Sequence, residues 1–77
     1  DNSFAISPNP THKYVEMPIT QSSLPLDISI YNTQGKLVLR KEEHFINTLD
    51  VSMLSEGVYI IHIAADFQYY TAKFIKN

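Results

Sequence analysis

The sequence predicts an all-β domain, a seven-stranded antiparallel Ig-like β-sandwich, from three observations. Apolar residues alternate with a period of two far more often than they recur at helical spacing. Turn-forming residues recur at intervals of about 8–12 residues, as in sandwiches. The chain has 77 residues, 44% of them hydrophobic, which is enough for a single domain with a thin core.

Seven runs of alternating residues define the expected strands. Pro8 and Pro10 end the first run, because proline fixes φ and cannot donate a ladder hydrogen bond. Pro18 and Pro25 bracket a polar segment, Ile19–Leu24, which we expect to be a surface loop. In chain order, the expected strands are Phe4–Ser7, His12–Met17, Leu26–Tyr31, Lys36–Arg40, Phe45–Val51, Val58–Ala65 and Gln68–Ile75.

Two hairpins supply most of the expected core. The first turns at Asn32–Gly35, where Asn tolerates left-handed φ and Gly has no Cβ, and charged residues 41–43 close its second strand. The second turns on Asp66–Phe67, without glycine. On the inward face of their strands we expect Leu26, Ile28, Ile30, Leu37, Leu39, Ile61 and Ile63.

The segment Leu49–Tyr59 predicts a sandwich corner. Sandwiches often carry a tyrosine just inside the strand after a corner, with its hydroxyl bonded to the backbone a few residues upstream. Leu54, Gly57 and Tyr59 have this spacing: Leu54 plugs the core, Gly57 takes the turn, and Tyr59 points inward. A single capped helical turn within Leu49–Glu56 is the alternative, so we expect little or no helix.

Composition excludes most chemistry. The chain has no cysteine, two glycines and a net charge of −2 without a basic stripe, so we expect no thiolate site, phosphate loop or nucleic-acid partner. His12, His44 and His62 are dispersed and form neither a metal-ligand spacing nor a triad. No apolar run approaches the roughly 18 residues of a membrane span. We therefore expect no enzyme, no metal, no cofactor and no small-molecule substrate.

Four motifs carry a resemblance when they are taken in order along the chain. The chain resembles the type A C-terminal sorting domain of the type IX (Por) secretion system of Bacteroidota. The resemblance covers nearly the whole chain, although Pro10–Pro25 carries none of the family's pattern and the last hairpin lacks glycine. The motifs are Ile6–Pro10 with Pro8, Asn9 and Pro10, then Ile28–Lys36 with Gly35 and Lys36, then Leu49–Tyr59 with Leu54, Gly57 and Tyr59, and last Lys73–Lys76.

The resemblance implies a secretion signal without catalysis. Such a domain passes through the periplasm at the C-terminus of its cargo and addresses the cargo to the outer-membrane translocon and its shuttle. A surface sortase, a cysteine protease, then removes the domain and can join the cargo to an anionic lipopolysaccharide, so the cargo ends at the outer membrane, at the cell surface or in the medium. The residues expected to be recognised by the translocon are Lys73, Phe74, Ile75, Lys76 and Asn77.

Physical reasoning adds expectations and alternatives. Lys73 and Lys76 lie three apart, so they face opposite sides of an extended strand, and lysines that merely protect a sheet edge are the alternative for this segment. The chain opens with Asp1, so residues 1–77 are expected to be one sorting domain excised from a larger exported protein. A different class, an Ig-like adhesion or carbohydrate-binding module, predicts an exposed aromatic patch, for which Tyr31, Tyr69 and Tyr70 are available. A spacer between enzyme domains is a third alternative.

Overall fold

The computed structural model describes residues 2–3, 10–16, 21–45 and 48–77, and within them all regular structure is β-strand. The all-β class is therefore confirmed. The strands are β1 (Asn2–Ser3), β2 (Tyr14–Glu16), β3 (Gln21–Asn32), β4 (Leu37–Phe45), β5 (Thr48–Asp50), β6 (Gly57–Ala65) and β7 (Gln68–Lys76).

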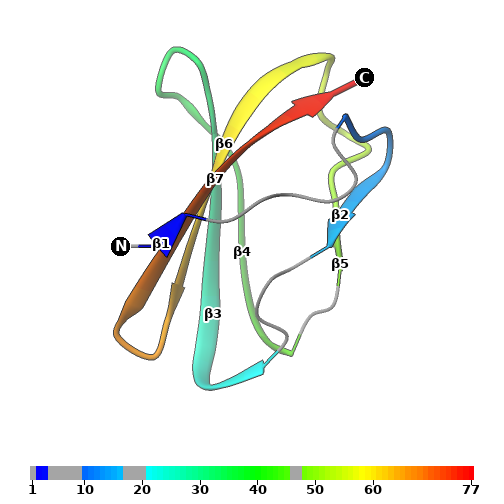
Figure 1. Cartoon of the computed structure of the whole chain (residues 1–77). Helices are drawn as coiled ribbons and strands as arrows, with labels where there is room; N and C mark the ends of the chain where they lie inside the picture. Colours follow the sequence, from blue (N-terminus) through cyan, green and yellow to red (C-terminus); the bar gives the residue numbers. More distant parts are fainter. Residues whose placement is uncertain (1, 4–9, 17–20, 46–47) are drawn as a thin grey trace.

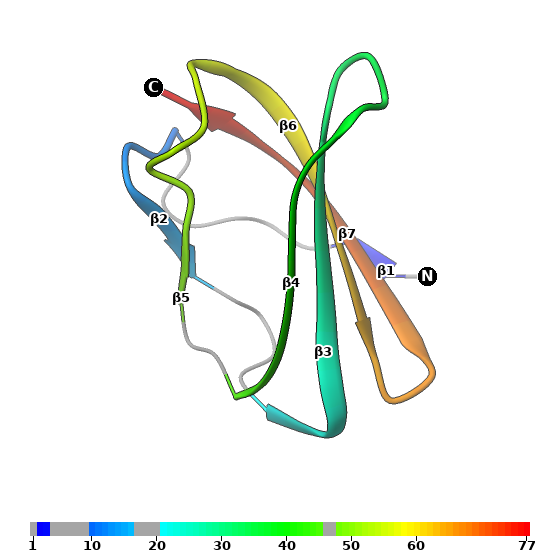
Figure 2. The same cartoon turned by 180° about the vertical axis from the view of Figure 1, so that it is seen from behind.

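The strands form two layers. Five of them make one sheet in the order β1-β7-β6-β3-β4, and β2 and β5 make a second, antiparallel pair. Figures 1 and 2 show this pair lying across one face of the larger sheet, so that the sheet has one covered face and one outer face. Alternation along β6 follows this division, because Tyr59, Ile61, Ile63 and Ala65 are buried while the residues between them are not.

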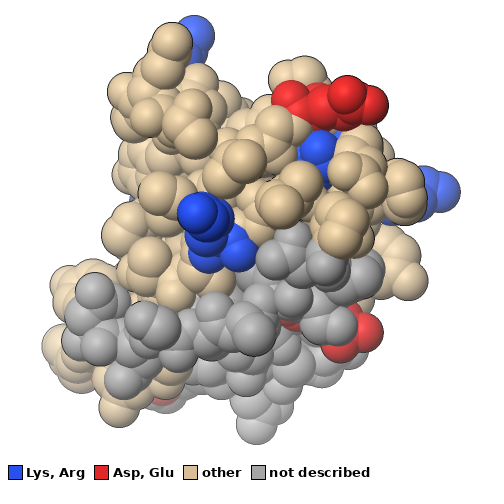
Figure 3. All heavy atoms as spheres, turned by 45° about the horizontal axis from the view of Figure 1, so that its top comes forward, with Lys and Arg blue, Asp and Glu red and all other residues tan. Residues whose placement is uncertain are grey.

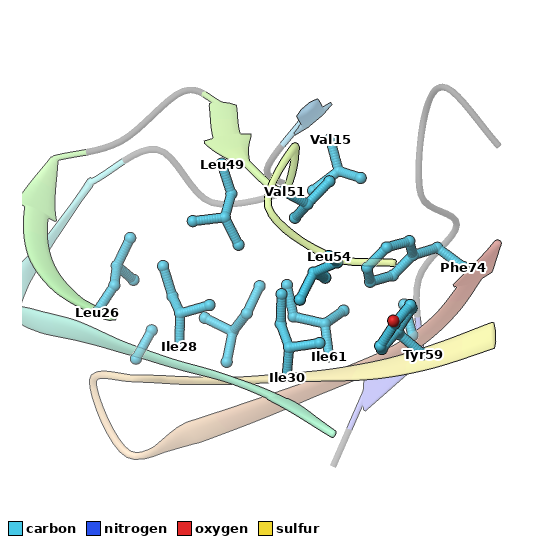
Figure 4. Packing of buried hydrophobic residues seen from close by; sticks show 13 residues of the cluster. Val15, Leu26, Ile28, Ile30, Leu49, Val51, Leu54, Tyr59, Ile61 and Phe74 are labelled. Atoms are coloured by element: carbon cyan, nitrogen blue, oxygen red, sulfur yellow. The ribbon is translucent and has the colours of Figure 1, made fainter. Parts of the chain in front are cut away.

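The core lies between the two layers. β2 and β5 contribute Val15 and Leu49, which face side chains from the larger sheet (Figure 4). The fully buried side chains are mostly branched aliphatic residues, which suit a pleated surface. The core cluster consists of Val15, Leu26, Ile28, Ile30, Leu49, Val51, Leu54, Tyr59, Ile61, Ile63, Ala65, Ala72 and Phe74.

Six of the seven expected strands have a counterpart among the described residues. The expected first strand, Phe4–Ser7, lies outside them, and Asn2–Ser3 forms a short strand that pairs parallel with β7. The pairings of β2, β3, β4, β5 and β6 are antiparallel. The described residues thus establish an all-β, mainly antiparallel sandwich, and its seven-stranded Ig-like form is not confirmed.

The expectation that Leu37 lies in the core is wrong. Ile30 pairs with Leu39 and Tyr31 with Leu37, so Val38 is an extra residue in β4 and forms a bulge. One extra residue moves everything beyond it to the opposite face. Leu37 is consequently 45% exposed, whereas Val38 and Leu39 pack against the core.

Two expected boundaries are also wrong. The strand that begins at Gln21 includes Pro25 and most of the segment expected as a loop. Pairing of β3 with β6 begins only at Asp27, so Pro25 is not required to donate a hydrogen bond toward β6. β4 likewise continues through the charged residues 41–43 to Phe45, which therefore does not open the next strand.

The charged residues of β4 lie along a sheet edge. Lys41 pairs with Ile28 and Glu43 with Leu26, and the two charged side chains form an ion pair of 3.7 Å. Because Ile28 and Leu26 point to the core, Lys41 and Glu43 lie on the core-facing side of the edge strand. Charges in this position discourage pairing with another strand.

Candidate functional site

The C-terminal strand β7 divides the expected recognition residues between two faces. Phe74 and Lys76 point to the core side, while Lys73 and Ile75 point to the outer face. The expectation that the two lysines face opposite sides is confirmed. Lys73, Ile75 and Asn77 are exposed, so a partner can reach their side chains in the folded domain.

Phe74 and Lys76 serve the fold. Phe74 is fully buried and stacks on Tyr59 with ring centroids 5.7 Å apart (Figure 4). Lys76 is only 7% exposed, and its Nζ donates a hydrogen bond to the backbone oxygen of Asn77 at 3.0 Å. Its stem covers the end of the sheet while its ammonium group meets an acceptor, as long cationic side chains do at the rim of a core.

The edge of β7 that faces away from β6 already makes backbone hydrogen bonds at several positions. β1 pairs with Tyr70 and Thr71, and the amide of Thr11 donates to the oxygen of Ile75 at 2.9 Å. The amide of Asn77 in turn donates to the oxygen of Thr11 at 2.8 Å. Thr11 is itself 1% exposed and bonds the oxygen of Tyr14 through its hydroxyl. At these positions a partner strand would have to displace existing hydrogen bonds, so side chains are the accessible feature.

The corner forms as the sequence predicts. The Tyr59 hydroxyl donates to the backbone oxygen of Ser55 at 2.8 Å, and Leu54 and Tyr59 are buried. Gly57 has a φ of 157°, which L side chains rarely adopt, and a Cβ there would meet the Tyr59 ring at 3.8 Å, an ordinary contact. The constraint on Gly57 is therefore conformational. Because Tyr59 also stacks on Phe74, the corner and the C-terminal strand share one packing unit.

Of the other motif residues, those that the structure describes lie in the β3–β4 turn, which begins at the partner of Tyr59, and beside Thr11. Gly35 has a φ of 82° in the β3–β4 turn, where Asn32 Oδ1 accepts from the amides of Gln34 and Lys36 at 2.9 and 3.0 Å. This confirms the expected turn, and Lys36 is exposed at its end. Pro10 is exposed beside Thr11, while Pro8 and Asn9 lie outside the described residues.

On the outer face, Lys73 and Ile75 lie beside two apolar residues of β6. The register places Val58 opposite Ile75 and Ile60 opposite Lys73. Directly opposed side chains have Cβ atoms about 4.5–5.5 Å apart, so the four side chains are neighbours. Ile75 is 44% exposed, and Val58 and Ile60 are half-buried. We call Val58, Ile60, Lys73 and Ile75 the outer patch.

Sequence reasoning singled out Lys73 and Ile75 but missed Val58 and Ile60. The available signal was the two-residue turn at Asp66–Phe67, because a hairpin of known loop length fixes which residues face each other. Figure 3, which brings forward the end of the molecule that carries the C-terminus, shows the charged side chains in separate groups among neutral ones. A lysine bordered by apolar residues is the chemical character of the outer patch.

Further along the outer face lies a shallow hollow of about 280 Å³. Asp27, Ser29 and Tyr31 of β3 line it together with His62 and Tyr69. Asp27 accepts from Arg40 at 2.9 Å, and this hydrogen bond raises the pKa of the Arg40 guanidinium above its usual value. His62 meets Tyr31 edge to face and lies 3.4 Å from the Thr71 hydroxyl.

Of the three tyrosines available for the aromatic patch of an adhesion module, Tyr31 and Tyr69 share the hollow, and Tyr70 does not line it. Tyr69 is 60% exposed, but Tyr70 packs against the core, and Tyr31 is half-buried beside His62. Among the described residues no three His, Cys, Asp or Glu side chains gather where they could hold a metal ion. The same residues contain no helix that is long and apolar enough to span a membrane.

The described residues define the class of small all-β sandwich domains, with a C-terminal strand that is buried on one face and exposed on the other. Comparison with family models identifies the particular family. The model described as the secretion system C-terminal sorting domain matches residues 5–77, nearly the whole chain. The chain therefore belongs to the C-terminal sorting domains of the type IX secretion system, which act in export as signals. Comparison with curated proteins finds no match.

Proposed function

We propose that this domain directs its cargo from the periplasm to the outer-membrane translocon of the type IX system, and that a surface sortase then removes it. The observation that carries the proposal is the family match over residues 5–77. The hollow lined by Tyr31 and Tyr69 is compatible with the adhesion and carbohydrate-binding alternative, but the family match does not support that alternative. The seven-stranded Ig-like form of the sandwich is part of the same proposal.

The outer patch is the surface that we propose the translocon or its shuttle reads. It combines an accessible cation with apolar area, on strands that the core and corner hold in place. Interfaces gain most of their affinity from a few such central contacts, and a charge at the rim adds specificity. Phe74 and Lys76 support the patch from the core side, whereas Lys73 and Ile75 contact the receptor.

Export of a fusion protein tests this function. Residues 1–77 are placed behind a signal peptide and a passive reporter in a host with type IX secretion, and reporter is measured at the cell surface and in the medium. We expect export, and we expect Lys73→Gln combined with Ile75→Ser to lower it about tenfold, the effect of losing a contact worth about 1.4 kcal/mol.

A matched control uses Lys41→Gln combined with Leu37→Ser, two positions outside the four motifs. This pair also joins an exposed lysine to a half-exposed aliphatic residue, since Leu37 is 45% and Ile75 44% exposed. Both residues lie in β4, on the far edge of the sheet (Figure 1). Equal losses for both pairs would remove the special role of the outer patch. Retention of a folded wild-type fusion in the periplasm would refute the sorting proposal itself.

A further inference from the structure

The turn between β6 and β7 holds a residue that its backbone disfavours. Asp66 has a φ of 47° and Phe67 a φ of 69°, and they join the paired residues Ala65 and Gln68. A two-residue turn with positive φ at both positions matches the twist of a hairpin and favours Asn followed by Gly. Aspartate tolerates this conformation, but a bulky residue such as Phe67 is an outlier in it.

The Phe67 side chain contributes almost no burial to the fold. It is 94% exposed, the highest value among the exposed large hydrophobic residues of the described chain. The turn would therefore form more easily with a glycine, and the core would lose nothing. A strained and fully exposed aromatic ring at a hairpin tip indicates a role outside folding, because strain that persists tends to mark functional positions.

We propose that the Phe67 ring is an anchor that inserts into an apolar pocket of a protein of the export machinery. This inference rests on the proposed function and extends it to a second contact. Aromatic side chains that fill a partner's pocket dominate the affinity of many interfaces. Tyr69, which is 60% exposed one residue beyond Gln68, adds a second aromatic ring near the tip, and its hydroxyl makes that ring amphipathic.

The charge of the hairpin favours a protein over a lipid surface. Residues 63–72 contain one acid, Asp66, and neither lysine nor arginine. Segments that settle on anionic membranes carry Lys or Arg, whereas an acid at the tip is repelled by the headgroups. The expected pocket is therefore apolar in its depth and neutral or basic at its rim.

The tip and the outer patch lie at opposite ends of β7 (Figure 1). Nine residues of extended strand separate the ends by roughly 26 Å, at about 3.3 Å per residue. Changes at such separated sites act independently on stability and binding. A variant at the tip therefore leaves the outer patch and the corner intact.

Replacement of Phe67 by glycine separates binding from folding. The Phe67→Gly chain should melt a few degrees above the wild type, since relief of strain outweighs the added freedom of the unfolded chain. In the reporter fusion the same substitution should lower export about tenfold. The separate variant Phe67→Trp keeps a large aromatic ring and should be exported like the wild type. Loss of export by a more stable domain cannot be attributed to unfolding.

Met53→Gln is the matched control, because Met53 is 63% exposed in the connection between β5 and β6, at the end of the molecule opposite the tip (Figure 1). It should export normally. Normal export of Phe67→Gly alongside the wild type would overturn the anchor and leave the sorting function standing. A lowered melting temperature of Phe67→Gly would also overturn it, because the ring would then support the fold. If the folded wild-type fusion is not exported, both proposals fall.

Discussion

At the scale of single residues, Tyr59 joins two parts of the domain. Its ring packs against Phe74 of the last strand, and its hydroxyl bonds the oxygen of Ser55 at the corner. Gly57 is favoured here because of its backbone conformation. Space is not the constraint, because the neighbouring atoms leave room for a Cβ. Tyrosine is favoured over phenylalanine here because the Ser55 oxygen requires a donor in a partly buried position.

Tyr59→Phe tests the hydroxyl alone. The substitution keeps the ring stack and removes the hydrogen bond to the Ser55 backbone oxygen together with the longer contact of 3.3 Å to Ser55 Oγ, so the free energy of unfolding should fall by about 1 kcal/mol. Urea denaturation of the purified chain measures the change through the midpoint, with an unchanged slope. An unaltered midpoint would show that solvent replaces the bond and that the corner needs only the ring.

At the scale of the element, the bulge in β4 decides which leucine supports the core. Val38 is the extra residue, and it turns Leu37 outward beside Tyr31 while Leu39 stays opposite Ile30. The same strand forms an edge of the larger sheet, where its charged residues oppose pairing with other chains. The bulge increases local twist and so also discourages such pairing.

Leucine-to-alanine substitution at two positions tests whether the bulge turns Leu37 out of the core. Leu26→Ala should cost about 2–5 kcal/mol, because Leu26 is fully buried and its loss leaves a cavity. Leu37→Ala should change stability by no more than about 0.5 kcal/mol, as is usual at the surface. Thermal and urea denaturation of both variants give the comparison. Similar losses would show that Leu37 returns to the core in solution.

At the scale of the whole molecule, the recognition strand is also a core strand. Phe74 lies between two proposed recognition residues and is fully buried. A chain of 77 residues has a total stability of roughly 4–12 kcal/mol, so the loss of one large aromatic side chain is a substantial fraction. A truncation that removes the exposed recognition residues of β7 therefore also removes a core residue, so it cannot separate recognition from folding.

Phe74→Ala should cost about 3–5 kcal/mol and leave a marginal or unfolded domain. Deletion of Lys73–Asn77 should have at least the same effect, because it removes Phe74 together with the displayed residues. Circular dichroism and urea denaturation of both variants measure the result. Retention of a cooperative, near wild-type transition by the deletion variant would show that β7 ends before Lys73 in solution.

The sequence by itself determined the all-β class, most strand centres, both hairpin turns and the corner of Leu54, Gly57 and Tyr59. These features follow from periodicity and from residues with special backbone preferences, which act within a few positions of the chain. The sequence also placed Lys73 and Lys76 on opposite faces of the last strand. A two-residue period is enough to place residues three apart on opposite faces.

Only the tertiary structure decided the surroundings of these residues. The burial of Lys76 and the pairing of Thr11 with the edge of β7 depend on segments distant in sequence. The bulge that exposes Leu37 lies within the β3–β4 hairpin, but the residues of its turn do not specify which residue of β4 is the extra one. The outer patch is an intermediate case, because the two-residue turn sets the register that places Val58 and Ile60 opposite Ile75 and Lys73, whereas their exposure depends on which face of the sheet is covered. Edge occupancy and the choice of covered face arise from long-range packing, which no local pattern in the chain specifies.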